Sequence, residues 1–175
     1  LIFAILAIGI SWFGAAAVGR VGFTSIPNTI ASLASLAVFI IPLIALLLAY
    51  NAIVGEDEEG TLLLLLTYPV SRAQLLLGKL LGHSLIMAIA TAIGFGSAAV
   101  VIGLLAHNVN TGDLTYAFVR FIITATLLGS VFISIAYFIS AIVTEKSKAA
   151  GLALIFWFFF VLVFDLALLA LLVVT

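Results

Sequence analysis

Charged residues are scarce in this chain. Asp, Glu, Lys and Arg make up 7% of the 175 residues, whereas 66% are hydrophobic. A soluble domain carries about 25% charged residues, so this sequence has too few of them to cover a water-facing surface. The apolar residues fall in long blocks, and about 20 residues of helix are enough to cross a hydrocarbon core about 30 Å thick. The composition therefore predicts an integral membrane protein.

Other absences exclude several kinds of site. The chain has no cysteine, which removes disulfides, thiolate catalysis and thiolate metal sites from it. Its single Met87 shares a helix face with His83, but one such pair cannot supply the successive soft ligands that copper transfer needs. We therefore expect no metal site and a structural role for His83. The net charge of −1 gives no indication of nucleic acid as a partner.

Five apolar blocks are close to or above spanning length. They cover residues 1–18, 30–52, 80–106, 117–143 and 149–174. Because weakly alternating strand patterns are absent, these blocks predict an all-α, polytopic transmembrane helix bundle. The chain starts without Met inside one block and ends inside another. We therefore expect residues 1–175 to be a single transmembrane domain whose first helix is cut and whose sixth helix follows.

The basic residues favour one orientation of these spans. Four of them fall on one side and two on the other: Arg72, Lys79, Lys146 and Lys148 against Arg20 and Arg120. Cytoplasmic loops carry an excess of Lys and Arg, so residues 53–79 and 144–148 are predicted to be cytoplasmic.

Much of the polar chemistry gathers in "GEDEEGTLLLLLTYPVSRAQLLLGK", residues 55–79, which also contains a run of five leucines. Arg72 and Lys79 would each cost about 2.5–3.5 kcal/mol near the centre of a spanning helix. Pro69 would also break the backbone hydrogen bonds of such a helix. The stretch is therefore predicted to lie along the membrane interface and not to cross.

Local signals divide this stretch into two short helices. Acidic residues 56–59 suit the positive N-terminal end of a helix that carries leucines 62–66 and ends at Pro69. "SRAQ" then indicates a capping box, with Ser71 as N-cap and Gln74 at the third helical position, which starts a second helix leading into the third span. Two interpretations stay open: an amphipathic segment that anchors a loop, or a docking surface for a cytoplasmic partner.

The order of these features resembles the ABC-2 type permeases of ATP-binding-cassette transporters. An acidic cluster is followed by Gly-Thr-Leu, a leucine run, Pro-Val-Ser-Arg and Leu-Gly-Lys, between the second and third spans. More narrowly, "NAIVGEDEEGTLLLLLTYPVSRAQLLLGKLLG" and "GFTSIPNTIASLASLAVFIIPLIALLLAY" are similar to permease subunits that serve maturation of nitrous oxide reductase, a periplasmic copper enzyme of denitrification. The resemblance assigns coupling to a cytoplasmic ATPase to ten residues: Glu56, Asp57, Glu58, Glu59, Gly60, Thr61, Pro69, Ser71, Arg72 and Lys79.

The resemblance also implies partners and a location. It implies a non-catalytic, multi-pass permease of the bacterial inner membrane. Two such permease subunits would assemble with two ATPase subunits, and a periplasmic accessory protein could be a further partner. The chain contains no GxxxxGK[ST] phosphate loop. ATP and Mg²⁺ are therefore expected on the ATPase, and no cofactor is expected in this chain.

Asp165 is the one acidic residue near the middle of a predicted span, where an ionisable group is costly. We expect its carboxyl to be neutral or turned toward a polar partner, either for helix packing or for the transport cycle. Two other protein classes remain as alternatives: an intramembrane enzyme such as a protease, and a membrane scaffold. An aspartyl protease needs a second intramembrane Asp, and the HExxH motif of zinc proteases is absent.

Overall fold

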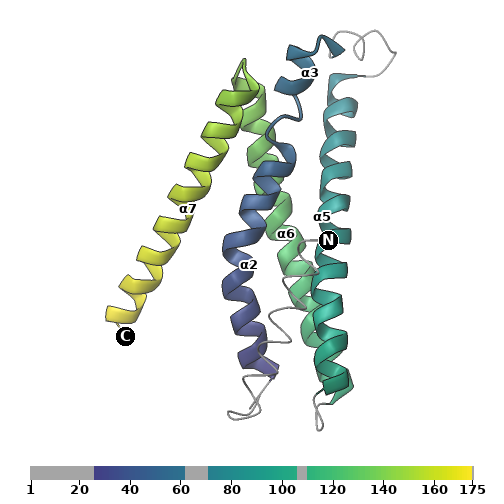
Figure 1. Cartoon of the computed structure of the whole chain (residues 1–175), viewed down its shortest axis with the longest axis vertical. Helices are drawn as coiled ribbons and strands as arrows, with labels where there is room; N and C mark the ends of the chain where they lie inside the picture. Colours follow the sequence, from purple (N-terminus) through teal and green to yellow (C-terminus); the bar gives the residue numbers. More distant parts are fainter. Residues whose placement is uncertain (1–25, 62–70, 106–109, 175) are drawn as a thin grey trace. The chain divides into compact units, whose positions relative to one another are not determined.

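The computed structural model describes residues 26–61, 71–105 and 110–174, and the elements in these residues are α-helices. The helices are α2 (Ile26–Ala49), α3 (Val54–Glu58), α5 (Arg72–Leu105), α6 (Thr111–Ile142) and α7 (Lys146–Val174) (Figure 1). The predicted all-α class is confirmed for this part of the chain.

Four helical stretches of the described residues are long and apolar enough to cross a membrane. They are Ile30–Glu58, Arg72–Leu104, Thr111–Ile142 and Lys146–Leu171. These stretches overlap the second to fifth predicted spans. The first predicted span, residues 1–18, lies outside the described residues, so the total of five spans stays a prediction.

Helix α5 begins well before the third apolar block. The predicted capping box is present. The backbone N–H of Gln74 donates to Ser71 Oγ at 3.2 Å, and the backbone N–H of Ser71 donates to Gln74 Oε1 at 3.0 Å. However, the expected second short helix is not a separate element, because α5 runs unbroken from Arg72 to Leu105. No proline interrupts its backbone hydrogen bonds, so the cap starts the spanning helix itself.

Helix α6 also begins earlier than its apolar block, residues 117–143. Its first turn is fixed by Asn110, whose side-chain Oδ1 accepts a hydrogen bond from the Gly112 amide at 3.0 Å. The Asn110 carbonyl accepts a second bond from the Leu114 amide at 3.1 Å. An Asx side chain that satisfies a free amide is a strong helix start, and it outweighs the polarity of the first helical residues.

The acidic cluster forms a helix of its own, which the sequence analysis did not predict. Helix α3 ends before Gly60, whose φ of +70° is the left-handed conformation that terminates helices. Residues 56–58 therefore belong to α3 instead of starting the helix expected over the leucines. Residues 62–66 and Pro69 lie outside the described residues.

The chain divides into two compact units. Unit 1 comprises Leu1–Val38 and Ser84–Leu128, and unit 2 comprises Phe39–His83 and Gly129–Thr175. Within unit 1, α5 and α6 pack through a hydroxyl pair, with Thr91 Oγ1 2.8 Å from Thr126 Oγ1. The rings of Phe95 and Phe121 meet edge to face, with centroids 4.7 Å apart. The expectation of a single transmembrane domain stays a prediction.

Within unit 2, α7 contacts α2 and α6 through aromatic side chains. The Trp157 indole N–H donates to the Phe39 carbonyl at 2.9 Å, three residues before the buried Pro42 of α2. The Phe132 ring of α6 meets the Phe160 ring of α7, with centroids 4.8 Å apart. The Trp157 bond thus joins α7 to a backbone carbonyl of α2 in the turn before its proline.

Candidate functional site

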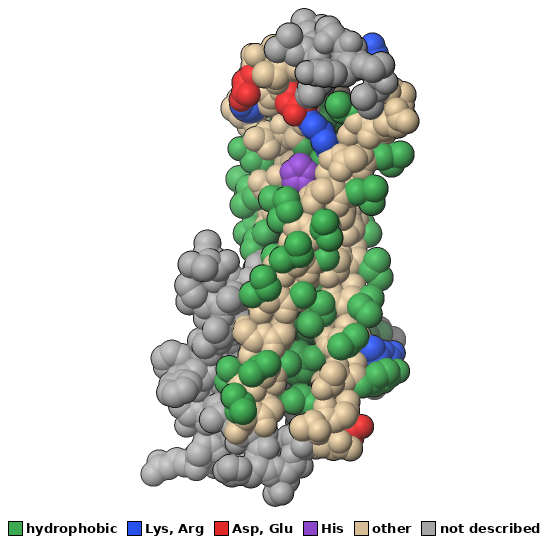
Figure 2. All heavy atoms as spheres, turned by 90° about the vertical axis from the view of Figure 1, so that its right-hand side faces the viewer, with side chains coloured by type: hydrophobic (Ala, Val, Ile, Leu, Met, Phe, Trp, Pro, Cys, Tyr) green, Lys and Arg blue, Asp and Glu red, His purple; other side chains and the backbone are tan. Residues whose placement is uncertain are grey.

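The polar residues of unit 2 gather around α3. Figure 2 shows acidic and basic side chains close together beside the histidine, whereas apolar side chains cover the long helices. Helix α3 has five residues, and it makes polar contacts with α5, α6 and α7, all within unit 2. Each of the three long helices thus holds the short one through a contact of its own.

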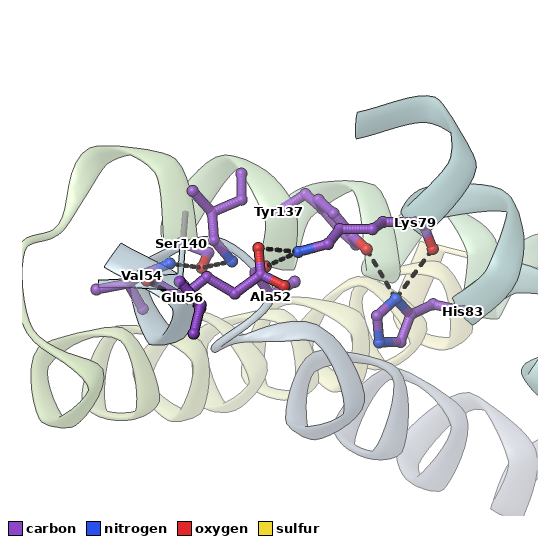
Figure 3. A network of polar contacts seen from close by, with 9 residues as sticks. Ala52, Val54, Glu56, Lys79, His83, Tyr137 and Ser140 are labelled. Atoms are coloured by element: carbon purple, nitrogen blue, oxygen red, sulfur yellow. Dashed lines mark hydrogen bonds and ion pairs between the residues drawn. The ribbon is translucent and has the colours of Figure 1, made fainter. Parts of the chain in front are cut away.

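Helix α6 caps the start of α3. Ser140 Oγ accepts hydrogen bonds from the Ile53 and Val54 amides, each at 3.0 Å (Figure 3). The first amides of a helix have no partner within it, and Ile53 supplies no side-chain cap of its own. Ser140 is 1% exposed, so water cannot replace its hydroxyl easily. The position of α3 is therefore fixed to α6 at its first turn.

Helix α5 holds α3 through Lys79. The Lys79 ammonium forms an ion pair with Glu56 and donates to the Ala52 carbonyl at 3.0 Å. The Glu56 oxygen that faces Lys79 is shielded from solvent. The Thr61 hydroxyl donates to the Glu56 carbonyl at 3.2 Å, which fixes Thr61 to α3. Partly buried charges are screened less by salt than exposed ones, so this attachment is firm.

His83 extends the network from α5 to α6. Its Nδ1 lies 3.0 Å from the Lys79 carbonyl oxygen and 2.7 Å from the Tyr137 hydroxyl (Figure 3). Tyr137 and Ser140 are three residues apart, so one face of α6 contacts both α5 and α3. His83 thus makes structural contacts, and Met87 is buried. Among the described residues, no group of three or more His, Cys, Asp or Glu could hold a metal ion.

Helix α7 is tied to α3 by its first residue, Lys146. The Lys146 amide donates to Glu58 Oε1 at 2.6 Å, and its ammonium donates to Glu59 Oε1 at 2.6 Å. The side chain also lies close over Gly55, where an added Cβ would stand 2.9 Å from Lys146 Cε. The Lys146 ammonium, by its hydrogen bond and its charge, lowers the pKa of Glu59 from its ordinary value of 4.5.

Half of the ten predicted coupling residues take part in these contacts: Glu56, Glu58, Glu59, Thr61 and Lys79. Asp57 and Arg72 are exposed and make no side-chain hydrogen bond or ion pair within residues 26–61, 71–105 and 110–174. Gly60 ends α3, Ser71 caps α5, and Pro69 lies outside the described residues.

Three residues of the network were missed by the sequence analysis: Ser140, Tyr137 and, as a contact of α3, Lys146. Lys146 had a usable signal, because it lies in a polar turn on the same predicted side as the acidic cluster. The contacts between Lys146 and α3 confirm that residues 58–59 and 146 lie together. Ser140 had no such signal, since several serines occur in this helix. Asp165 lies in α7, but its side chain is outside the described part of the structure.

Comparisons with known proteins place this chain in a family. The sequence profile of the family described as ABC-2 family transporter protein matches residues 6–175. The chain is 67% identical over 175 residues to a protein named "Probable ABC transporter permease protein NosY" from Stutzerimonas stutzeri, covering all of this chain and 63% of that protein. It is 65% identical over 175 residues to the protein of the same name from Pseudomonas aeruginosa, covering 64% of it. The chain thus spans less than two thirds of these relatives.

Proposed function

The chain belongs to the ABC-2 family of transporter proteins, and we propose that its α3 end receives the movements of a separate, ATP-hydrolysing subunit. The observation that carries this proposal is the attachment of one short helix to three long ones. Ser140, Lys79 and Lys146 bind α3 to α6, α5 and α7 respectively. A push on α3 would therefore reach three candidate spans at once, and the chain would act as a permease that does not itself hydrolyse ATP.

The free charges beside this network offer a surface for such a partner. Asp57 on α3 and Arg72 at the start of α5 are exposed, and neither is used within the described part of the chain. Complementary charges steer a partner and fix its register on a surface. Lys79 belongs to the polar segment of residues 53–79, and Lys146 and Lys148 belong to the polar segment of residues 144–148. These basic residues support a cytoplasmic location for both segments by the positive-inside rule. The bacterial inner membrane is the location proposed for the protein.

The wider role follows from the sequence resemblance. We propose that the complete protein forms a complex of two permease and two ATPase subunits, in which ATP and Mg²⁺ bind to the ATPase and this chain holds no cofactor. Its task would be the maturation of a periplasmic copper enzyme similar to nitrous oxide reductase, with a periplasmic accessory protein as a further partner. Support comes from the 65–67% identity to the two permeases named above and from the residues 55–79 that carry the resemblance.

Charge reversal at the exposed residues tests the proposed contact. In the complete permease, Asp57→Lys and Arg72→Glu together should weaken co-purification of the ATPase by at least about tenfold, because like charges would then face each other. Asp113→Lys, at the exposed start of α6, is the matched control and should leave ATPase binding unchanged. Equal ATPase recovery from the double variant and the control would contradict the proposed docking surface.

A further inference from the structure

The three attachments of α3 differ in their access to water. Ser140, which binds α3 to α6, is 1% exposed. The Lys79 and Glu56 side chains are 24% and 27% exposed, whereas those of Lys146 and Glu59 are 35% and 61% exposed. Ion pairs in contact with water are weak and screened by salt. The attachment to α7 is therefore the one that opens most easily.

Helix α7 is also the candidate span with the least packing around it. In its most apolar window 6% of the residues are buried, compared with 28–39% in the other three candidate spans. Its polar link to α2 in unit 2 is the Trp157 bond to the Phe39 carbonyl. Association of helices in a membrane depends on close packing and interhelical hydrogen bonds. Within residues 26–61, 71–105 and 110–174, α7 therefore has fewer packing contacts than the other three candidate spans.

We propose that Lys146 is a releasable latch. It ties α7 to α3 in one nucleotide state of the complex and releases α7 in the other, while α3 stays on α5 and α6. The fit of the residue supports this role: its stem lies over Gly55, its amide is bonded by Glu58 and its ammonium by Glu59. All three contacts involve one partly exposed residue at the first position of α7, so they can form and break together. The latch rests on the proposed coupling and names the helix that the coupling frees.

Cross-linking across the latch tests the proposal in the complete permease–ATPase complex in lipid nanodiscs. Because residues 1–175 contain no cysteine, Glu59→Cys with Lys146→Cys introduces the only two thiols of this stretch, and any cysteine elsewhere in the complex is replaced by serine. A short bifunctional methanethiosulfonate reagent should bridge them in one nucleotide state. We expect at least about a fivefold difference in yield between nucleotide-free complex and complex with a non-hydrolysable ATP analogue, because the two positions are adjacent only while α7 is held on α3.

Locking the latch gives a second readout, which a merely structural contact would not change. The bridged complex should hydrolyse ATP at least about fivefold more slowly than the same complex after reduction, since α7 can no longer separate from α3 during the cycle. The control is Glu145→Cys with Lys148→Cys, whose native side chains pair 2.6 Å apart where α7 begins, Glu145 directly before the helix and Lys148 in its first turn. Bridging that pair should leave hydrolysis unchanged.

Three outcomes would overturn the latch: no bridging in either state, equal yields in both states, or equal hydrolysis by the bridged and reduced complexes. Failure of the proposed function is distinct from all three. In that case the ATPase would not co-purify with the unmodified permease, and the cross-linking experiment would have no complex to report on.

Discussion

Removal of the Ser140 hydroxyl should loosen α3 without disturbing the long helices. The hydroxyl accepts hydrogen bonds from two amides, those of Ile53 and Val54, and Val54 is 1% exposed. A buried group left without its partner costs about 1–3 kcal/mol, and loss of a helix N-cap costs about 0.5–2 kcal/mol. The two figures describe the same loss, so Ser140→Ala should destabilise the start of α3 by about 1–3 kcal/mol.

Hydrogen exchange measured by mass spectrometry is the assay. A loss of about 1–3 kcal/mol corresponds to about 5- to 150-fold faster exchange of the amides at positions 53 and 54. Ser134→Ala is the matched control, because the Ser134 hydroxyl bonds the Ser130 carbonyl one turn earlier in α6 and does not contact α3. Exchange at residues 53–54 that is the same in both variants would refute the idea that Ser140 caps α3.

Three further predictions concern α7 and the acidic cluster. Trp157→Phe keeps an aromatic ring but loses the bond to the Phe39 carbonyl, so resistance to denaturing detergent should fall by about 0.5–1.5 kcal/mol; an unchanged midpoint would contradict this. The lowered pKa of Glu59 means that its pairing with Lys146 stabilises the fold above the ordinary carboxyl pKa and is lost as pH falls through the folded value. Carboxyl ¹³C NMR should show this pKa returning to about 4.5 in Lys146→Met, and a value unmoved by that substitution would exclude the pair as its cause. Asp165→Asn should assemble like the unmodified protein and Asp165→Leu less well, as judged by recovery of intact complex in mild detergent; equal recovery would show that the carboxyl has no polar partner.

The helices and their caps were predictable where the signal is local. Apolar blocks of spanning length predicted four of the described helices, and the capping box of Ser71 and Gln74 lies within four consecutive residues. The helix boundaries were less predictable, because a helix can begin with a polar first turn that lies outside its apolar block. Helix α5 therefore starts at Arg72, well before its apolar block, and α3 appears where the acidic residues were expected to start a different helix.

The contacts of the candidate site could not be predicted in the same way. Ser140 and Val54 are 86 residues apart in sequence, and Lys146 and Glu59 are 87 apart. Nothing in the helix around Ser140 distinguishes it from other serines that bond their own backbone, as Ser134 does. The charge pattern placed the acidic cluster and Lys146 on one side of the membrane, but only the packed structure shows that they touch.

The central claim is that the α3 end of the chain contacts an ATPase, and site-specific photo-cross-linking tests it most directly. A photoreactive amino acid would replace exposed Asp57 on α3 or, as a control, exposed Tyr116 near the start of α6. Tyr116 lies 24 residues before Ser140 in the same helix, a separation of about 36 Å. If this contact exists, we expect an adduct with the ATPase from position 57 and none from position 116. An adduct from position 116 with none from position 57 would contradict it.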